Sequence, residues 1–389
     1  MNLQKNAPLV ERHRPQSLQQ IVGQQNVVAV LQGFVKHRNM PNIMLSGIAG
    51  VGKTSAAFSF INDFYAGFGI SEWSSLVLSI NASRENGIET IREQITPFTN
   101  ASYRSQPGVC RQLADAAEGD LRLGTQTTVP KIVVLDEADQ LTKVAQWALG
   151  PIIDQCTDNA RFIFIVNYER KIQDDLKSRC QSLRFPPLPR EAVKRLIANV
   201  CVQEKISFEP RAAAAIAVVS QNDMRRALNV LSSCVVQKKA EPHEPLTDSF
   251  VYRAAGRVEP SVTLALLQCI LTDPSVGLAD VCKRLQQHMI EHSISPSQLL
   301  CDMHDICTQL AAPNDKLDTI IVEENAALSG IFEQDQFAQS LFEDISLIEK
   351  NLLAITDSAR MLLHTRAFGA ALWKLKQQSV AKKKEQTKN

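Results

Sequence analysis

An eight-residue stretch at positions 47–54 constrains the fold of this chain more than any other feature. Its letters, GIAGVGKT, match the pattern G-x-x-x-x-G-K-[ST] and stand between an apolar run at 43–46 and a helical pattern rich in Ala and Phe. A glycine loop in this position turns backbone N–H groups toward phosphate oxygens at a helix N-terminus, where the helix dipole favours negative charge. The sequence therefore predicts a phosphate-binding loop between a strand and a helix.

Residues of this loop have expected places around ATP. Lys53 is expected to neutralise the β and γ phosphates, and Thr54 is expected to ligate Mg²⁺. The expected nucleotide contacts of the loop and the residue after it are Gly47, Ile48, Ala49, Gly50, Val51, Gly52, Lys53, Thr54 and Ser55. The alternative is a chance glycine-rich turn, and the strand and helix on either side argue against it.

Apolar runs rich in β-branched residues recur along the first half of the chain and alternate with helical patterns. They lie at 43–46, 76–80, 132–135, 162–166 and 182–185. Two of them, KIVVLDE and RFIFIVN, are apolar on both faces, as is typical of strands in a parallel sheet that helices cover on both sides. The pattern predicts an α/β nucleotide domain with a parallel sheet.

The composition changes after residue 188. A cluster of prolines at 186, 187 and 189 ends the strand pattern, and Ala and Leu then recur at helical spacing. We expect an α/β domain at 1–188, a small helical domain at 189–254, a second helical domain at 255–378 and a basic tail at 379–389. A polar stretch at about 102–129 indicates a long surface insertion whose role the sequence does not define.

The balance of charge and the cysteine pattern exclude some classes of protein. Lys and Arg total 42 against 41 Asp and Glu, so no global field draws the chain to nucleic acid, and any DNA contact must come from a local patch. Nine cysteines without a C-x-x-C pair indicate a reducing interior. No run approaches the roughly eighteen consecutive apolar residues of a membrane helix. We therefore expect no membrane partner.

A second acidic motif follows the run at 132–135. Asp136 is expected to hold the Mg²⁺ shell, and Glu137 to polarise the attacking water as general base. Residues 136–139 also spell DEAD, the letters that name a large helicase family. Those helicases carry a Ser-Ala-Thr motif and a second RecA-like domain, and this chain has neither, which argues against the helicase alternative.

Segments along most of the chain share a further resemblance. They are VERHRP at 10–15, NMPN at 39–42, the phosphate loop, NAS at 81–83, GI at 87–88, DEAD at 136–139, AQ at 145–146, SRC at 178–180 and DMRRALN at 223–229. Together they resemble the small subunits of replication factor C, the eukaryotic sliding-clamp loader, an AAA+ ATPase. Residues 167–168 and 252–256 look most like the subunit in the middle of the pentamer arc. The resemblance implies an α/β AAA+ domain, an α-helical lid and an α-helical collar.

The resemblance also implies roles for single residues. Asn167 matches sensor 1, an amide that orients the attacking water, and Arg225 matches sensor 2, which reaches from the lid to the same nucleotide. Arg179 matches the arginine finger, which serves the ATP of a neighbouring subunit. Val10 and Arg14 match residues that flank the purine and the phosphates.

Partners follow from the resemblance in the same way. It implies a heteropentamer of paralogous subunits, a sliding clamp, primer–template DNA contacted through its backbone, and a place in the nucleus. Arg92 matches one basic residue that follows the DNA, and Arg84 carries a positive charge that has moved upstream relative to the family. A solvated helix face is the alternative for Arg92.

Departures from the family leave other possibilities open. Gly150 and Pro151 stand where the family has two arginines, and they are expected to kink or end their helix. Coupling through this helix to DNA or to a neighbour is therefore in question. A subunit shared with a checkpoint clamp loader or another loader, and a largely structural subunit with weak ATPase activity, are the rival functions.

Overall fold

The computed structural model describes residues 7–101, 129–238, 245–273 and 276–311, with three residues at 369, 370 and 373. Its contacts divide the chain into two units, Met1–Asp248 and Ser249–Asn389. Nearly all of the predicted insertion at 102–129, the basic tail and most of the predicted collar beyond residue 311 lie outside the described residues.

Five parallel strands form the sheet of the first unit, in the order β2-β3-β4-β1-β5. They are β1 (Ile43–Ser46), β2 (Val77–Asn81), β3 (Lys131–Asp136), β4 (Ala160–Val166) and β5 (Gln181–Arg184). Each predicted apolar run coincides with one strand to within two residues. The prediction of an α/β domain with a parallel sheet is confirmed.

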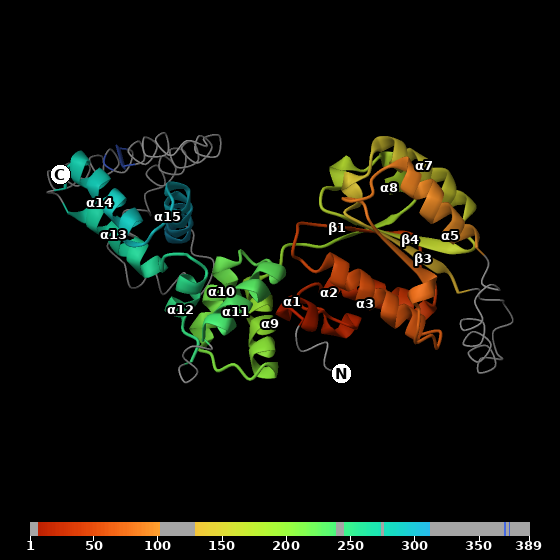
Figure 1. Cartoon of the computed structure of the whole chain (residues 1–389), viewed down its shortest axis with the longest axis horizontal. Helices are drawn as coiled ribbons and strands as arrows, with labels where there is room; N and C mark the ends of the chain where they lie inside the picture. Colours follow the sequence, from red (N-terminus) through yellow and green to blue (C-terminus); the bar gives the residue numbers. More distant parts are fainter. Residues whose placement is uncertain are drawn as a thin grey trace, which may run out of the picture. The chain divides into compact units, whose positions relative to one another are not determined.

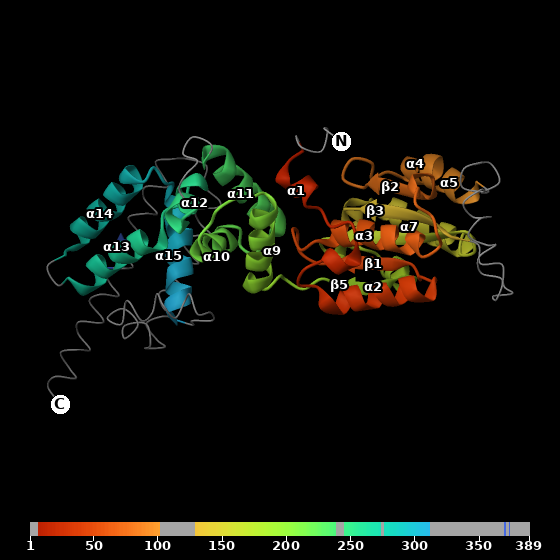
Figure 2. The ribbon, with the colours of Figure 1, turned by 90° about the horizontal axis from the view of Figure 1, so that it is seen from below.

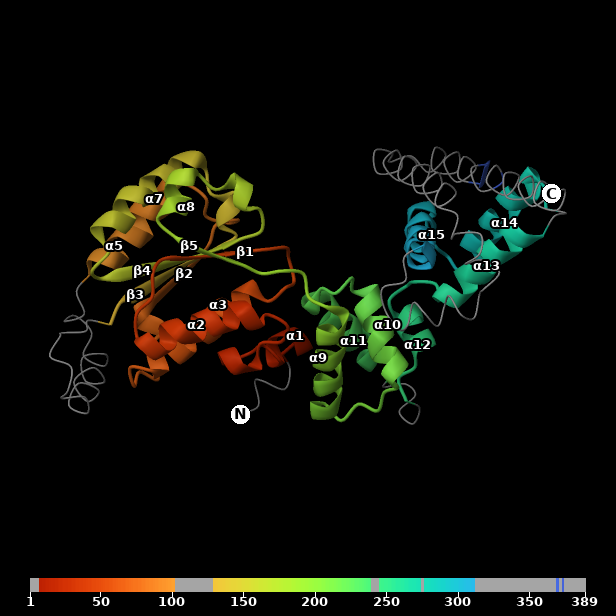
Figure 3. The same ribbon diagram turned by 180° about the vertical axis from the view of Figure 1, so that it is seen from behind.

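Helices cover both faces of this sheet, as Figures 1 and 3 show from opposite sides. On one face lie α2 (Gln25–His37) and α3 (Lys53–Ala66); on the other lie α4 (Ile88–Thr90), the π-helical turn η4 (Ile91–Ile95), α5 (Thr96–Asn100), α7 (Lys143–Gln155) and α8 (Asp174–Ser178). The α7 face packs through a buried cluster that includes Leu135, Phe162, Phe164 and Leu149. Short 3-10 turns connect the elements: η2 (Leu18–Gln20), η3 (Ser74–Leu76), η6 (Ala138–Gln140) and η7 (Glu169–Lys171).

Helix α7 continues through Pro151, so of the two expected outcomes, a kink or an end of the helix, the end does not occur. A proline inside a helix removes one backbone hydrogen bond, here the bond that residue 151 would donate to the carbonyl of Trp147. Leu149 and Ile153 are both buried against the sheet, one on each side of the proline. Packing on both sides therefore keeps the helix continuous where local propensity predicts a break.

The remainder of the first unit is a helical lid. It comprises α9 (Arg190–Gln203), α10 (Pro210–Val219) and α11 (Met224–Lys238), and the short N-terminal helix α1 (Leu9–Arg12) packs against α11. Seven of the ten residues of α10 are buried, since alanines allow α9 and α11 to approach it closely (Figure 2). Phe208 and Leu246 form an isolated β-bridge, which pairs the segment before α10 with the segment after α11.

The second unit is helical throughout its described part. After α12 (Asp248–Ala254), which begins at the boundary between the units, come α13 (Pro260–Thr272), α14 (Leu278–Glu291) and α15 (Pro296–Ala311). Leu267, Val281, Leu285 and Met303 are buried within it. No helix in the described ranges is long and apolar enough to cross a membrane.

Candidate functional site

Most of the predicted nucleotide residues meet at the carboxyl edge of the sheet. The register pairs Ser46 with Val166 and Asn81 with Asp136, so the ends of β1, β3 and β4 lie at one edge. A cavity of about 220 Å³ opens there. The predicted site residues that line it are Val10, Arg14, Ala49, Gly50, Val51, Gly52, Lys53, Thr54, Ser55, Asp136, Glu137, Asn167 and Arg225.

The glycines give the phosphate loop its shape. Gly50 and Gly52 have φ angles of 76° and 95°, in the region that favours glycine. Gly52 is the N-cap of α3, so the loop leads directly into the helix N-terminus. Gly50 has a second reason to be glycine, because a Cβ atom there would lie 2.1 Å from the carboxylate of Asp223.

That close approach joins the lid to the phosphate loop. The backbone N–H of Met224, at the start of α11, donates to the carbonyl of Gly50 at 3.2 Å. Asp223 caps α11, accepting hydrogen bonds from the N–H groups of Arg225 at 2.8 Å and Arg226 at 3.0 Å. The first turn of α11 is thereby fixed beside the loop, and this turn brings Arg225 to the cavity.

Lys53 connects the loop to the end of β4. Its Nζ donates to the carbonyls of Gly47 and Ile48, both at 2.7 Å, and to Oδ1 of Asn167 at 2.9 Å. The residue is only 6% exposed. Burial lowers the pKa of its ammonium group, while the nearby carboxylates of Asp136 and Asp139 act in the opposite direction. The ammonium group is thus partly desolvated, and a bound anion would stabilise its charged form.

Thr54 and Asp136 offer oxygen ligands at adjacent positions. The Thr54 hydroxyl donates to Oδ2 of Asp136 at 3.2 Å, and Oδ1 of Asp136 accepts from the N–H of Glu137 at 2.9 Å. A hydroxyl and a carboxylate are the hard oxygen donors that Mg²⁺ prefers, so these residues fit that ion. Glu137 has a φ of 54°, an uncommon conformation for a residue other than glycine, and one that is concentrated at functional sites.

One wall of the cavity is formed partly by the N-terminal segment. Val10 lies in α1, and Arg14 follows two residues after this helix. The Arg14 guanidinium lies 5.3 Å from the ring centroid of Phe58 and 3.5 Å from the Glu11 carboxylate. These contacts fix Arg14 at the cavity wall.

Asp139 and Asp223 make contacts that the sequence motifs did not predict. Asp139 has a fully buried side chain, and its Oδ1 accepts from the N–H of Asn167 at 3.1 Å. It therefore holds the end of β4 where Asn167 meets Lys53. Asp223 acts similarly for the lid. Asp139 lies in the DEAD motif and Asp223 in the DMRRALN motif. The motifs identify both residues, but they do not show which backbone groups these carboxylates bond.

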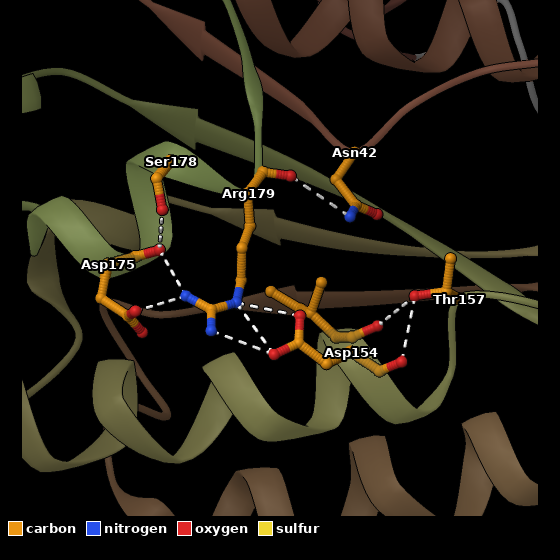
Figure 4. A network of polar contacts seen from close by, with 7 residues as sticks. Asn42, Asp154, Thr157, Asp175, Ser178 and Arg179 are labelled. Carbon is orange, nitrogen blue, oxygen red and sulfur yellow. Dashed lines mark hydrogen bonds and ion pairs between the residues drawn. The ribbon is translucent and has the colours of Figure 1, made fainter.

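Other predicted residues lie outside the cavity. Gly47 and Ile48 offer carbonyls to Lys53 without lining the cavity. Arg84 lies in the turn after β2 and Arg92 in the π-helical turn η4, and both side chains are exposed. Arg179 lies two residues before β5, at the amino edge of the sheet, where it pairs with Asp154 and Asp175 (Figure 4).

The fold and the site together define the class of protein. A phosphate loop after β1, an acidic pair after β3, an amide after β4 and a helical lid form the nucleotide site of an AAA+ ATPase. The model of the ATPase family associated with various cellular activities matches residues 43–188, and the RCF1/5-like AAA+ ATPase lid domain matches residues 195–236.

Relatives narrow the class to one family. Replication factor C subunit 3 of Saccharomyces cerevisiae is 35% identical over 269 residues, which are 69% of this chain and 72% of the relative. A probable replication factor C subunit 5 of Caenorhabditis elegans is 30% identical, covering 86% and 85% of the two chains. The replication factor C small subunit of Thermofilum pendens is 36% identical, covering 82% and 88%. The chain belongs to the replication factor C subunits, the ATPases of the multi-subunit clamp loader.

Proposed function

We propose that this subunit binds ATP and Mg²⁺ in the cavity at the carboxyl edge of its sheet, and that a neighbouring subunit completes the site. The observation that supports this most directly is the single hydrogen-bonded set that joins the phosphate loop, Lys53 and Asn167. Each member can act on the same triphosphate because the loop that contains Lys53 follows β1, Asn167 follows β4, and these two strands are neighbours in the sheet.

Each polar residue has a defined task in this proposal. Thr54 and Asp136 hold Mg²⁺, which supplies positive charge beside the phosphate oxygens. Lys53 neutralises the β and γ phosphates, Asn167 orients the attacking water, and Glu137 accepts its proton. Arg225 couples the lid to the nucleotide.

Arg179 serves the ATP of the neighbour in this proposal. It lies before β5 at the amino edge, whereas the cavity lies beyond the carboxyl ends of the strands. Strand β1, which pairs with β5, contributes four residues between these edges, roughly 13 Å at about 3.3 Å per residue. Arg179 is therefore poorly placed for its own nucleotide.

The assembly around this subunit is also part of the proposal. Bound ATP favours a closed arrangement of paralogous subunits that grips a sliding clamp and primer–template DNA, and hydrolysis releases both. Arg84 and Arg92, both exposed and both following β2, contact the DNA backbone without reading its sequence. This role places the protein in the nucleus of a eukaryotic cell.

Nucleotide affinity tests the core of the proposal. Lys53→Met removes charge-assisted hydrogen bonds, each worth about 1.5–3 kcal/mol, so ATP affinity is expected to fall about 10- to 100-fold in equilibrium titrations. Lys131→Met is the matched control, because Lys131 is equally buried and bonds to the carbonyls of Phe98 and Ala101 instead. Unchanged affinity in a folded Lys53→Met protein would contradict the proposal.

A further inference from the structure

The main chain of Arg179 is fixed to the sheet. Its carbonyl accepts from Nδ2 of Asn42 at 3.4 Å. The Oδ1 of Asn42 accepts from the N–H of Phe162 at 3.0 Å, and the carbonyl of Asn42 accepts from the N–H of Gln181 at 2.8 Å. Asn42 thus connects Arg179 to the first residues of β5 and to β4, and Figure 4 shows its bond to the Arg179 carbonyl. Any change in the reach of Arg179 must come from its side chain.

That side chain is held by two carboxylates from different helices. Nε of Arg179 donates to both oxygens of Asp154 on α7, at 3.0 and 3.2 Å, and Nη2 donates to Oδ2 of Asp154 at 3.0 Å. Nη1 donates to the Asp175 carbonyl on α8 at 2.8 Å and also to Oδ1 of Asp175. We call Asp154 and Asp175 the carboxylate bracket. Hydrogen bonds to the bracket raise the pKa of Arg179, and the hydrogen bonds from Arg179 lower the pKa of Asp154; the opposite charges act in the same direction.

The bracket depends on a glycine in α7. A Cβ atom at Gly150 would lie 2.8 Å from Oδ2 of Asp175 and 3.8 Å from Cζ of Arg179. The absence of a side chain at this position lets the Asp175 carboxylate of α8 approach α7 beside Asp154. The same residue that departs from the family pattern therefore makes room for both carboxylates around one arginine.

A bracketed Arg179 is unsuited to bind a phosphate. Four of the five N–H groups of a guanidinium are engaged by the bonds described above. Two carboxylates around one cation also leave a net charge of about −1, which repels an anionic triphosphate. A phosphate can gain the fork-shaped contact that arginine offers only after these bonds are broken.

The bracket can open, because it lies at the surface. The Arg179 side chain is 28% exposed, and those of Asp154 and Asp175 are 56% and 54% exposed. Water and salt screen ion pairs in such positions, so they hold a side chain less firmly than buried pairs do. A competing anion from another molecule can therefore displace the carboxylates.

We propose that Asp154 and Asp175 are positioning residues that hold Arg179 withdrawn from the neighbour's nucleotide until the subunits close on each other. This inference rests on the proposed function, in which Arg179 acts on the adjacent site. Its consequence is that the unstimulated assembly hydrolyses ATP more slowly than the same assembly with a released arginine. The bracket affects turnover and leaves the ATP affinity of this subunit unchanged.

The test uses the reconstituted assembly containing Asp154→Asn, Asp175→Asn or both. Steady-state ATP hydrolysis is measured without DNA or clamp, over a range of ATP concentrations. If the bracket restrains Arg179, kcat is expected to rise roughly threefold or more in the double variant, with little change in KM, because a larger fraction of the arginine is competent. Asp174→Asn is the matched control, since Asp174 is next in the same helix and pairs with Lys177.

Adding Arg179→Ala separates this inference from the proposed function. If the bracket acts through Arg179, the gain from the double variant disappears in the Arg179→Ala background. If Arg179→Ala alone leaves turnover unchanged, the proposed role of Arg179 fails and the inference fails with it. If Arg179→Ala lowers turnover but the double variant equals wild type or falls below it, only the bracket is refuted.

Gly150→Ala gives an independent route that keeps both carboxylates. The added Cβ displaces the end of the Asp175 side chain, so basal kcat is expected to rise in the same direction. Size-exclusion chromatography shows whether each variant still assembles. Wild-type kcat in an assembled Gly150→Ala complex would overturn the part of the inference that concerns Asp175.

Discussion

Glu137 shows how one backbone conformation can direct a carboxylate into a cavity. Glu137 directly follows β3 and has a φ of 54°, and its N–H donates to the carboxylate of Asp136. Both carboxylates therefore come to the cavity from consecutive residues, although side chains at consecutive strand positions normally point to opposite faces. The turn to a left-handed conformation makes this possible.

Replacing Glu137 by Gln tests its role as a base. The amide keeps the size of the side chain but cannot accept the proton, so turnover of this site is expected to fall about 10²- to 10⁴-fold. ATP affinity is expected to stay within a fewfold of wild type, as equilibrium titration would measure. Turnover at the wild-type rate would remove Glu137 as the general base.

Among single residues, the sequence predicts best those that belong to short motifs of defined chemistry. Lys53, Thr54 and Asp136 belong to short motifs, so their meeting at one cavity could be expected from the letters and the parallel sheet. Asp139 could not be assigned in this way. Its role depends on complete burial and on a bond to the backbone N–H of Asn167, 28 residues away. Long-range backbone partners leave no local signal in the sequence.

The contact between the lid and the phosphate loop is the main feature at the scale of elements. Helix α11 begins where Asp223 meets Gly50, so the angle of the lid and the shape of the loop depend on each other. Because Arg225 stands in the same turn, a shift of α11 also moves this cation relative to the phosphate loop.

Gly50→Ala tests this contact. The substitution forces a left-handed conformation that costs about 1–2 kcal/mol and pushes a methyl group against Asp223. Both the free energy of unfolding, from urea denaturation, and ATP affinity are expected to decrease. Gly33→Ala is the control: it lies inside α2 with open space around it, and it is expected to stabilise the protein by about 0.5–1 kcal/mol. Equal effects of both substitutions would contradict the role of Gly50.

The strands of the sheet were easier to predict than the continuity of α7. Buried strands such as β3 and β4 are apolar on both faces, and this pattern is local. The fate of α7 at Pro151 depends on Leu149 and Ile153 packing against a sheet formed by distant segments. Tertiary packing of this kind overrides local propensity, so the sequence alone could not exclude an end of the helix at Pro151.

At the scale of the whole molecule, the proposed function makes the nucleotide site half of a larger one. The charged residues that line the cavity belong to this chain, whereas Arg179 stands at the opposite edge of the sheet. A single sequence can therefore specify what binds ATP, but it cannot specify which neighbour supplies an arginine to it. The sequence likewise does not specify a DNA-binding surface, because the net charge of +1 gives the chain no general affinity for DNA.

The salt dependence of DNA binding tests the proposed roles of Arg84 and Arg92. Replacing both by Gln is expected to flatten the plot of log affinity against log salt for the assembly. Each lost phosphate contact reduces the slope by about 0.9. Lys36→Gln is the control, because Lys36 is exposed on α2, on the other face of the sheet. An unchanged slope in the double variant would count against contacts with the DNA backbone.

Arg179→Ala tests most directly whether this subunit completes the site of its neighbour. Two quantities are measured: the ATP affinity of the purified variant chain, and ATP hydrolysis by the assembly that contains it. The affinity is expected to equal that of the wild-type chain, while hydrolysis at the adjacent site falls by about 10³- to 10⁵-fold, as for other arginine fingers. A large loss of affinity in the isolated chain, with hydrolysis at the adjacent site unchanged, would contradict a role in the neighbour's site.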